Sequence, residues 1–181
     1  MVFNYTTTIF ESVGANLDRQ LLEMVAIGFV NLIFTLVAMW QVDKLGRKPL
    51  MLFGAGALAV LHVIIAVLLH NQDASIWLSI VVLAAISVYA TSLAPVTWVL
   101  ISEIFPNKVR GMATSIAVLA LWAAYFVVVF TFPILARHLG TYGPFFMYAA
   151  VCGIGFVFVF FKVKETKGKT LEELEGVFVA H

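Results

Sequence analysis

Five long stretches without a charged residue dominate this sequence, at positions 24–42, 49–72, 74–102, 111–136 and 138–161. About 20 helical residues cross the hydrocarbon core of a bilayer, so each stretch is long enough to span it. A large soluble core would need helices with a polar face, and 62% hydrophobic against 12% charged residues leaves too few polar side chains for one. The sequence therefore predicts an all-α integral membrane protein.

The flanking residues set the expected domain organisation. We expect the five spans at about 20–42, 49–70, 75–105, 111–136 and 143–163. They form one transmembrane bundle over residues 1–164, and residues 165–181 form a tail in which Thr170 and Glu173 have the spacing of a capping box. The uncharged N-terminus lacks the basic region of a signal peptide, and it opens as if in the middle of a helix.

Lysine and arginine gather between alternate spans, and this placement predicts the orientation. Loops rich in these residues stay in the cytoplasm. Nine of the eleven fall on one predicted side, and only Arg19 and Arg137 fall on the other. We therefore expect a multi-pass protein of the inner (plasma) membrane, in contact with the lipid bilayer and with its C-terminus in the cytoplasm.

Residue patterns that carry enzyme chemistry are absent from the sequence. The single cysteine, Cys152, can form neither an intrachain disulfide nor a zinc cluster within this chain. The sequence has no His/Glu metal spacing, no G-x-S-x-G and no Cys/His pair. With a net charge of +1 and basic residues only in short clusters, a nucleic-acid partner is not indicated either. We expect no enzyme activity, no cofactor and no metal.

Pro95 predicts a break in the third span. It removes a backbone hydrogen bond from the helix and clashes with the preceding turn, so we expect a bend between Thr91 and Trp98. Broken helices at membrane depth persist where protein or a water-filled cavity accepts the freed carbonyl groups, and in transporters they often lie at the substrate site. Thr91, Pro95, Trp98 and Ser102 recur at helical spacing and are expected on one face.

Three polar or amphipathic side chains lie deep in their spans. The amide of Asn31 is costly to bury unpaired, so it either forms an interhelical hydrogen bond or faces a polar cavity. Trp98 and Trp122 either fill the core or form a flat apolar wall for a sugar ring, with their N–H groups free to bind a hydroxyl. His62 is interpreted as a packing residue with one hydrogen bond.

Small residues predict close helix packing. Residues 54–57, with the sequence Gly-Ala-Gly-Ala, lie in the second span, and Gly153 and Gly155 lie in the fifth. Small side chains let helices in lipid approach closely. We expect both groups at helix–helix contacts.

Three motifs together resemble one family. Residues 43–48, D-K-L-G-R-K, resemble the D-x-x-G-R-[RK] loop of major facilitator transporters. Residues 95–111, P-V-T-W-V-L-I-S-E-I-F-P-N-K-V-R-G, resemble the P-x-x-W…S-E-[IL]-F-P-x-x-x-R-G segment of sugar porters. Residues 165–170, E-T-K-G-K-T, resemble the signature P-E-T-K-G-[KR]-[ST] after their last helix. The first motif is shared by many facilitator families, whereas the second and third in this order are specific to sugar porters.

The resemblance implies the C-terminal half of a twelve-helix major facilitator fold, with five full transmembrane helices plus part of a sixth. It implies a missing N-terminal six-helix half as partner, and alternating-access transport of a monosaccharide, a hexose or a pentose, coupled to protons in the complete protein. Sugar-contacting positions of the family match Tyr5, Asn31, Trp98 and Trp122. Its cytoplasmic gating charge network matches Asp43, Arg47, Lys48, Glu103, Arg110 and Glu165.

The physics of that network is independent of the resemblance. Arg47 and Arg110 can each donate paired hydrogen bonds to a carboxylate, and three acids are predicted on the same side. Such pairs at helix ends can latch two bundles and must part when the other state forms. The alternative is that these basic residues only fix the topology.

The sequence departs from the family pattern near the positions that contact the sugar. Leu121 stands where the family often has an amide that touches the sugar. Ala94 stands where many members have Gly before the Pro, and Thr97 stands where some have a second Pro. The chain is also compatible with a truncated, non-transporting remnant or with a transporter-like sugar sensor.

Overall fold

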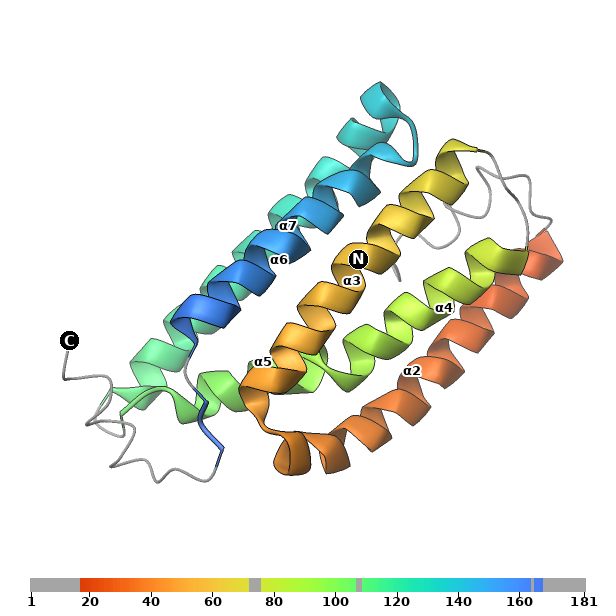
Figure 1. Ribbon diagram of the computed structural model, residues 1–181. Coiled ribbons are helices and arrows are strands. Elements are labelled where there is room, and N and C mark those ends of the chain that lie inside the picture. The colour runs from red at the N-terminus through yellow and green to blue at the C-terminus, as the bar shows by residue number, and fades with distance from the viewer. Residues whose placement is uncertain (1–16, 72–75, 107–108, 164, 168–181) are drawn as a thin grey trace.

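The computed structural model describes residues 17–71, 76–106, 109–163 and 165–167. In this part of the chain the helices are α2 (Leu17–Leu45), α3 (Arg47–His70), α4 (Ile76–Thr91), α5 (Leu93–Glu103), α6 (Arg110–Leu139) and α7 (Gly143–Lys162). Their length and hydropathy give five candidate membrane spans among the described residues, because α4 and α5 together count as one. The predicted all-α membrane bundle is confirmed (Figure 1).

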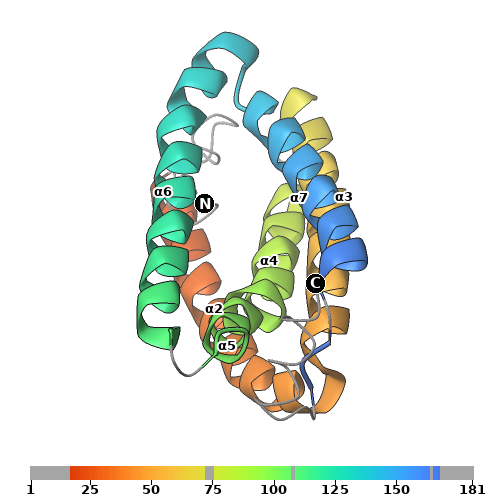
Figure 2. The ribbon, with the colours of Figure 1, turned by 90° about the vertical axis from the view of Figure 1, so that its left-hand side faces the viewer.

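Two helix pairs and one outlying helix make up the bundle. The helix α3 packs most extensively along α7, α2 lies beside α4, and contacts between α3 and α4 join the pairs (Figure 1). The helix α6 is connected to α7 by a short turn, and Figure 2 shows it on the opposite side of the bundle from α7 and α3. The bundle thus presents a packed side and an open side.

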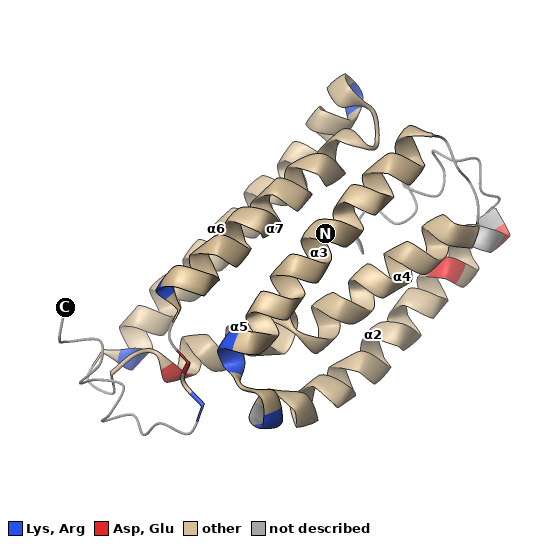
Figure 3. Cartoon of the chain, in the orientation of Figure 1, with Lys and Arg blue, Asp and Glu red and all other residues tan. Residues whose placement is uncertain are grey.

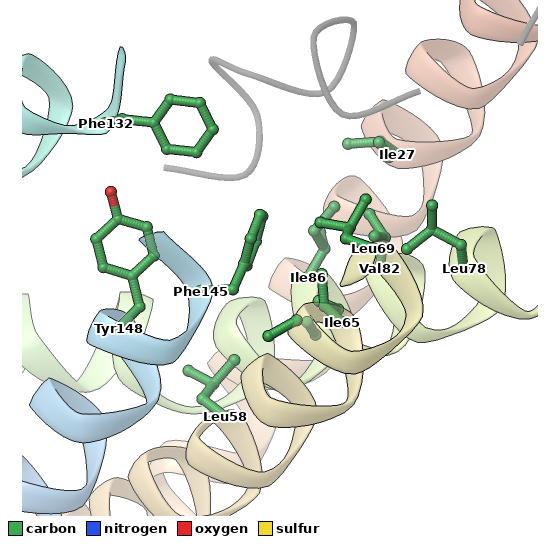
Figure 4. Close-up of a cluster of buried hydrophobic side chains, with 12 residues drawn as sticks. Ile27, Leu58, Ile65, Leu69, Leu78, Val82, Ile86, Phe132, Phe145 and Tyr148 are labelled. Carbon is green, nitrogen blue, oxygen red and sulfur yellow. The ribbon is translucent and has the colours of Figure 1, made fainter. Parts of the chain in front are cut away.

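The main core lies where α3, α4 and α7 meet. Ile65 and Val82 are fully buried there, and Phe145 packs against them from α7 (Figure 4). His62 is also buried, with its Nδ1 2.7 Å from the carbonyl oxygen of Leu58 and its ring stacked on Phe145. The interpretation of His62 as a packing residue with one hydrogen bond is confirmed.

The helices α2 and α6 expose most of their apolar side chains. Phe132 is the one described residue of α6 that is buried, and Leu119 is 73% exposed. A contiguous apolar surface of this kind is not stable in water, so it must be covered by lipid or by other helices.

The third span is interrupted at Ser92, between α4 and α5. Pro95 has no N–H and cannot donate to the carbonyl of Thr91 four residues earlier. The backbone N–H of Ser92 still donates to the carbonyl of Val88 at 3.1 Å. Figure 1 shows α5 continuing in a different direction from α4. The predicted bend between Thr91 and Trp98 is confirmed.

Gly54 of α3 packs directly against this interruption. A Cβ atom at Gly54 would lie 2.8 Å from the Cβ of Ser92, closer than real Cβ contacts. A Cβ at Gly56 would lie 3.4 Å from the ring of Phe156 in α7, which is a contact at the edge of the ordinary range. The packing prediction is therefore confirmed for the second span.

For Gly153 and Gly155 the packing prediction is wrong within the described residues. An added Cβ at either position would meet nothing within 4 Å among them. Gly153 lies in the open groove along α7, where only lipid or a further protein surface can reach it. Gly155 lies at helical spacing from the buried Tyr148 and Val159, but no neighbouring side chain or backbone among the described residues comes close to it.

Candidate functional site

The first candidate site lies at the turn between α2 and α3, which consists of one residue, Gly46. Its φ of +93° lies in the region that side chains with a Cβ rarely adopt. A Cβ here would also lie 2.8 Å from Oε2 of Glu165. Glycine is required twice, once for the backbone and once for the approach of the carboxylate.

Arg47, the first residue of α3, binds the carboxylate of Glu103 at the end of α5. Its Nη2 donates to Oε1 at 2.7 Å and its Nε to Oε2 at 3.2 Å. A third donor, Nη1, bonds to the carbonyl of Val42 at 3.3 Å. The side chain of Arg47 is only 12% exposed and that of Glu103 27%, so water screens this paired contact less than a surface ion pair.

The carboxylate of Glu165 caps the N-terminus of α3. Its two oxygens accept from the backbone N–H groups of Arg47 and Lys48, each at 3.0 Å. They also accept from the N–H groups of Thr166 and Lys167 at 3.0 and 2.9 Å. The N–H groups of Arg47 and Lys48 lie at the start of α3 and have no partner within the helix, and the helix dipole there favours a negative charge.

The same contacts set the pKa of Glu165. Burial alone would raise the pKa of this carboxyl, but the four backbone N–H donors stabilise the charged form and hold the pKa below its usual value. The group is therefore a carboxylate at neutral pH, as the capping role requires.

Three more side chains hold the same end of the bundle together. We call the whole group the charged cluster; it comprises Arg47, Lys48, Glu103, Glu165, Thr166 and Lys167. The hydroxyl of Thr166 donates to Oε2 of Glu103 at 2.9 Å, and Nζ of Lys48 donates to the carbonyl of Phe160 at 2.9 Å. Nζ of Lys167 donates to the carbonyl of Lys44. The cluster thus joins the α2–α3 turn, the end of α5 and the end of α7 at one end of the bundle (Figure 3).

A second candidate site is a cleft of about 430 Å³ between α4, α5 and α6, which we call the aromatic cleft. Its walls are Tyr89, Ala94, Thr97, Trp98, Leu121, Trp122 and Tyr125. Trp122 and Tyr125 meet edge to face with ring centroids 5.8 Å apart. Its volume lies within the range of ligand pockets, roughly 300–1,000 Å³, and its mixture of ring faces with a few polar groups is typical of them.

Comparison with known proteins identifies the family. Residues 1–178 match the family model described as "Sugar (and other) transporter". The chain belongs to this family. It is 39% identical over 178 residues to the putative metabolite transport protein YwtG of Bacillus subtilis (strain 168), covering 96% of this chain and 39% of that protein. It is 38% identical over 184 residues to the D-xylose-proton symporter of Escherichia coli (strain K12), covering 98% and 38%.

The fold agrees with a solved member of the same superfamily. The structure of the major facilitator proton:xylose symporter XylE bound to 6-bromo-6-deoxy-D-glucose superposes with a TM-score of 0.87 and 38% identity, covering 97% of this chain and 38% of that one. The chain spans about two fifths of the length of these relatives. It is an integral membrane protein of the major facilitator fold, and its family is one of transporters rather than enzymes.

Within this chain, the structure brings some predicted residues together and not others. Trp98 and Trp122 line one cleft, whereas Asn31 is half-buried on α2, which contributes no wall to that cleft. The carbonyl of Asn31 accepts from the hydroxyl of Thr35 at 2.7 Å. Tyr5 lies outside the described residues. Of the four residues expected on one face of the third span, only Trp98 lines the cleft; Thr91 lies on α4, before the break at Ser92.

The structure also brings only some of the predicted charged residues together. Arg47, Lys48, Glu103 and Glu165 meet in the charged cluster, but Arg110 binds no carboxylate among the described residues. Its Nε donates to the carbonyl of Phe105 at 3.3 Å, and its Nη2 is buried without a partner there. The side chain of Asp43 and the expected tail helix with Thr170 and Glu173 lie outside the described residues.

Sequence reasoning missed several contributors to both sites. Thr166 and Lys167 of the charged cluster belong to the motif after the last helix. From that motif only Glu165 was predicted to take part in the charge network. In the cleft, Tyr125 was missed although it follows Trp122 by three residues and so shares its helix face. Tyr89 carried no such signal, because it lies on the other side of the break at Ser92.

A further groove runs along α7 from Ala150 to Lys162 and has a volume of about 620 Å³. Its walls all come from this one helix and are apolar except for Lys162. A groove of this composition on an outer helix suits acyl chains of lipid better than a polar solute.

Proposed function

We propose that the chain is part of a secondary transporter that carries a monosaccharide, a hexose or a pentose, across the membrane by alternating access. The observation that carries the proposal is the aromatic cleft, with Trp98 and Trp122 on its walls. A sugar ring presents C–H faces that stack on indole rings and hydroxyls that accept from indole N–H groups. Relatives that include a D-xylose-proton symporter support the same substrate class.

The charged cluster fits the role of a latch in this transporter. It ties the ends of α3, α5 and α7 together through carboxylates that each accept several hydrogen bonds. Opening the bundle at this end requires these bonds to part, so their free energy sets part of the balance between the two states. Asp43 and Arg110 belong to the same proposed network through the family resemblance.

The topology proposal places the charged cluster in the cytoplasm. The concentration of lysine and arginine at this end of the described chain supports it, because such residues stay on the inner side of a plasma or bacterial inner membrane (Figure 3). In this orientation residues 165–181 are a cytoplasmic tail that follows the bundle of residues 1–164.

A second bundle of six helices is the proposed partner. Transporters of this kind hold their substrate between two halves that rock about it, and this chain spans about two fifths of its relatives' length. The aromatic cleft, open on one side, is then closed by the other half. Proton coupling belongs to the complete protein in this proposal, supported by the proton symporter among the relatives.

Uptake into proteoliposomes tests the proposal. A chimera joins this chain to the N-terminal half of the D-xylose-proton symporter, and uptake of radiolabelled D-xylose and D-glucose is measured with and without an inward proton gradient. We expect saturable uptake that the gradient accelerates, with L-glucose as the stereochemical control. Neither sugar entering through a correctly folded chimera would contradict the proposal.

Asn31→Ala in the same chimera tests the residue that lies outside the aromatic cleft. If its amide binds a buried sugar hydroxyl, removing it costs about 1–3 kcal/mol of binding and raises the dissociation constant roughly five- to hundred-fold. Thr35→Ala, which alters only a hydroxyl bonded to the carbonyl of Asn31, is the matched control. Unchanged affinity in Asn31→Ala would make this residue a packing residue.

The alternatives to transport are a non-transporting remnant and a transporter-like sugar sensor. The same measurements separate the three functions. Sugar binding without uptake by the chimera indicates a sensor, and neither binding nor uptake indicates a remnant. The chain on its own is expected to show no saturable uptake, because its cleft has one open side.

A further inference from the structure

The aromatic cleft has a restricted set of polar groups. Among the residues that the structure describes, none of its walls carries a carboxylate, an amide or a basic side chain. Trp98 and Trp122 can only donate, through one N–H each. The hydroxyl of Thr97 already donates to the carbonyl of Leu93 at 2.6 Å, so it offers the cleft only lone pairs. The remaining polar groups are the phenol hydroxyls of Tyr89 and Tyr125.

Leu121 and Ala94 form the apolar part of the same wall. Leu121 precedes Trp122 on α6 and both line the cleft, so a ring stacked on Trp122 has an edge beside Leu121. When the proposed other half covers the cleft, a hydroxyl at that edge leaves water and finds no donor or acceptor on the leucine side chain. Burying a hydroxyl without a hydrogen bond is unfavourable, whereas a C–H or methyl group at the same place is favoured.

We propose that the aromatic cleft selects a deoxy sugar, which presents hydrogen or a methyl group rather than a hydroxyl to Leu121. The inference rests on the proposed sugar-binding function of the cleft and names the substrate class within it. Leu121 is then the residue that sets specificity at this edge. The expected preference over the parent sugar is about 5- to 100-fold, the order by which apolar pockets reject an added hydroxyl.

Binding measurements on the chimera test the proposal without any variant. The probes are D-xylose, D-glucose and the 2-deoxy, 3-deoxy, 4-deoxy and 6-deoxy analogues of D-glucose, followed by quenching of tryptophan fluorescence. We expect at least one analogue to bind about five-fold or more tightly than D-glucose. If D-xylose or D-glucose binds and no analogue binds more tightly than D-glucose, the deoxy-sugar proposal is overturned while the sugar-binding function stands. If none of the six sugars binds to folded protein, both fail.

A pair of variants assigns the preference to Leu121. Leu121→Gln supplies a donor and an acceptor at this edge, so it should weaken the binding of the preferred analogue and strengthen that of D-glucose, removing the preference. Leu121→Met keeps the apolar character and should leave the preference unchanged. A preference that persists in a folded Leu121→Gln protein would overturn the role of this residue, and the series on the unaltered chain decides the proposal if that variant does not fold.

Discussion

The charged cluster and the aromatic cleft are built on opposite principles. In the cluster, the carboxylates of Glu103 and Glu165 each accept several hydrogen bonds and tie together segments that are distant in sequence. In the cleft, Trp98 and Trp122 are 51% and 56% exposed. Interactions already made in the folded chain contribute to its stability, whereas groups left open are available to a ligand. We therefore expect the cluster to govern stability and the cleft to govern binding.

Gly46→Ala should break the cluster most severely. The new Cβ lies 2.8 Å from Oε2 of Glu165 and forces an alanine into a φ of +93°, so we expect a loss of about 2–4 kcal/mol in the free energy of unfolding. Denaturant unfolding in detergent measures it. Gly28→Ala is the control, because a Cβ there meets nothing within 4 Å and should stabilise the helix by up to about 1 kcal/mol. Equal stability of the two variants would contradict the tight turn.

Glu103→Gln should have the next largest effect. It removes the carboxylate charge that accepts two hydrogen bonds from the largely buried guanidinium of Arg47, and we expect a loss of about 2 kcal/mol. A double-mutant cycle with Arg47→Gln isolates the pair, and Ser102→Ala controls for changes at the end of α5, since the hydroxyl of Ser102 bonds only within its own helix. Fully additive single losses would show that the pair contributes nothing.

Glu165 makes the stability of the cluster depend on pH. Its pKa is lower in the folded chain than its ordinary value of 4.5, so its contribution is fully present above about pH 4.5 and is lost as the pH falls through the folded pKa. Because the group is partly exposed, we expect about 1 kcal/mol or less. Thermal unfolding at neutral and acid pH should show a smaller acid loss for Glu165→Gln than for the unaltered chain. An identical loss of stability at acid pH in both proteins would show that Glu165 does not cause the pH dependence.

Trp122→Ala should have the smallest effect on stability. This variant tests the comparison at the aromatic cleft rather than at the charged cluster. The ring is more than half exposed and its described ring contact is with Tyr125, so we expect a loss of about 1 kcal/mol or less. Phe145→Ala in the core is the contrasting variant and should lose about 3–5 kcal/mol. If Trp122→Ala destabilises the protein as much as Phe145→Ala, the cleft is part of the core.

The bundle was predictable because its signals are local. Long charge-free runs fix the spans, and Pro95 locates the bend to within a few residues, since its missing N–H acts on its own helix. The interruption falls at Ser92, in the turn before Pro95 that the proline ring disturbs, and Gly54 of α3 packs against it there. The small residues at 54–57 predicted a close helix contact, but the sequence did not show that Ser92 would be the partner of Gly54.

The sites were predictable only in part for the same reason. The motifs brought Arg47, Glu103 and Glu165 into one group, but the capping of α3 by Glu165 uses backbone N–H groups, which every residue except proline has. The cleft depends on how α4, α5 and α6 are rotated against one another. Trp98 and Trp122 were recognised by type, whereas Leu121 was noticed only as a departure and Asn31 was expected in the same cavity.

Sugar affinity in the full-length chimera tests most directly the claim that the aromatic cleft binds a sugar. The measurement compares the unaltered cleft with Trp98→Ala, and Trp77→Ala is the matched control because Trp77 is an exposed tryptophan of α4 outside the cleft. We predict that Trp98→Ala raises the dissociation constant by about 5- to 100-fold while Trp77→Ala leaves it unchanged. Equal affinity of Trp98→Ala and the unaltered protein, with folding intact, would contradict the account.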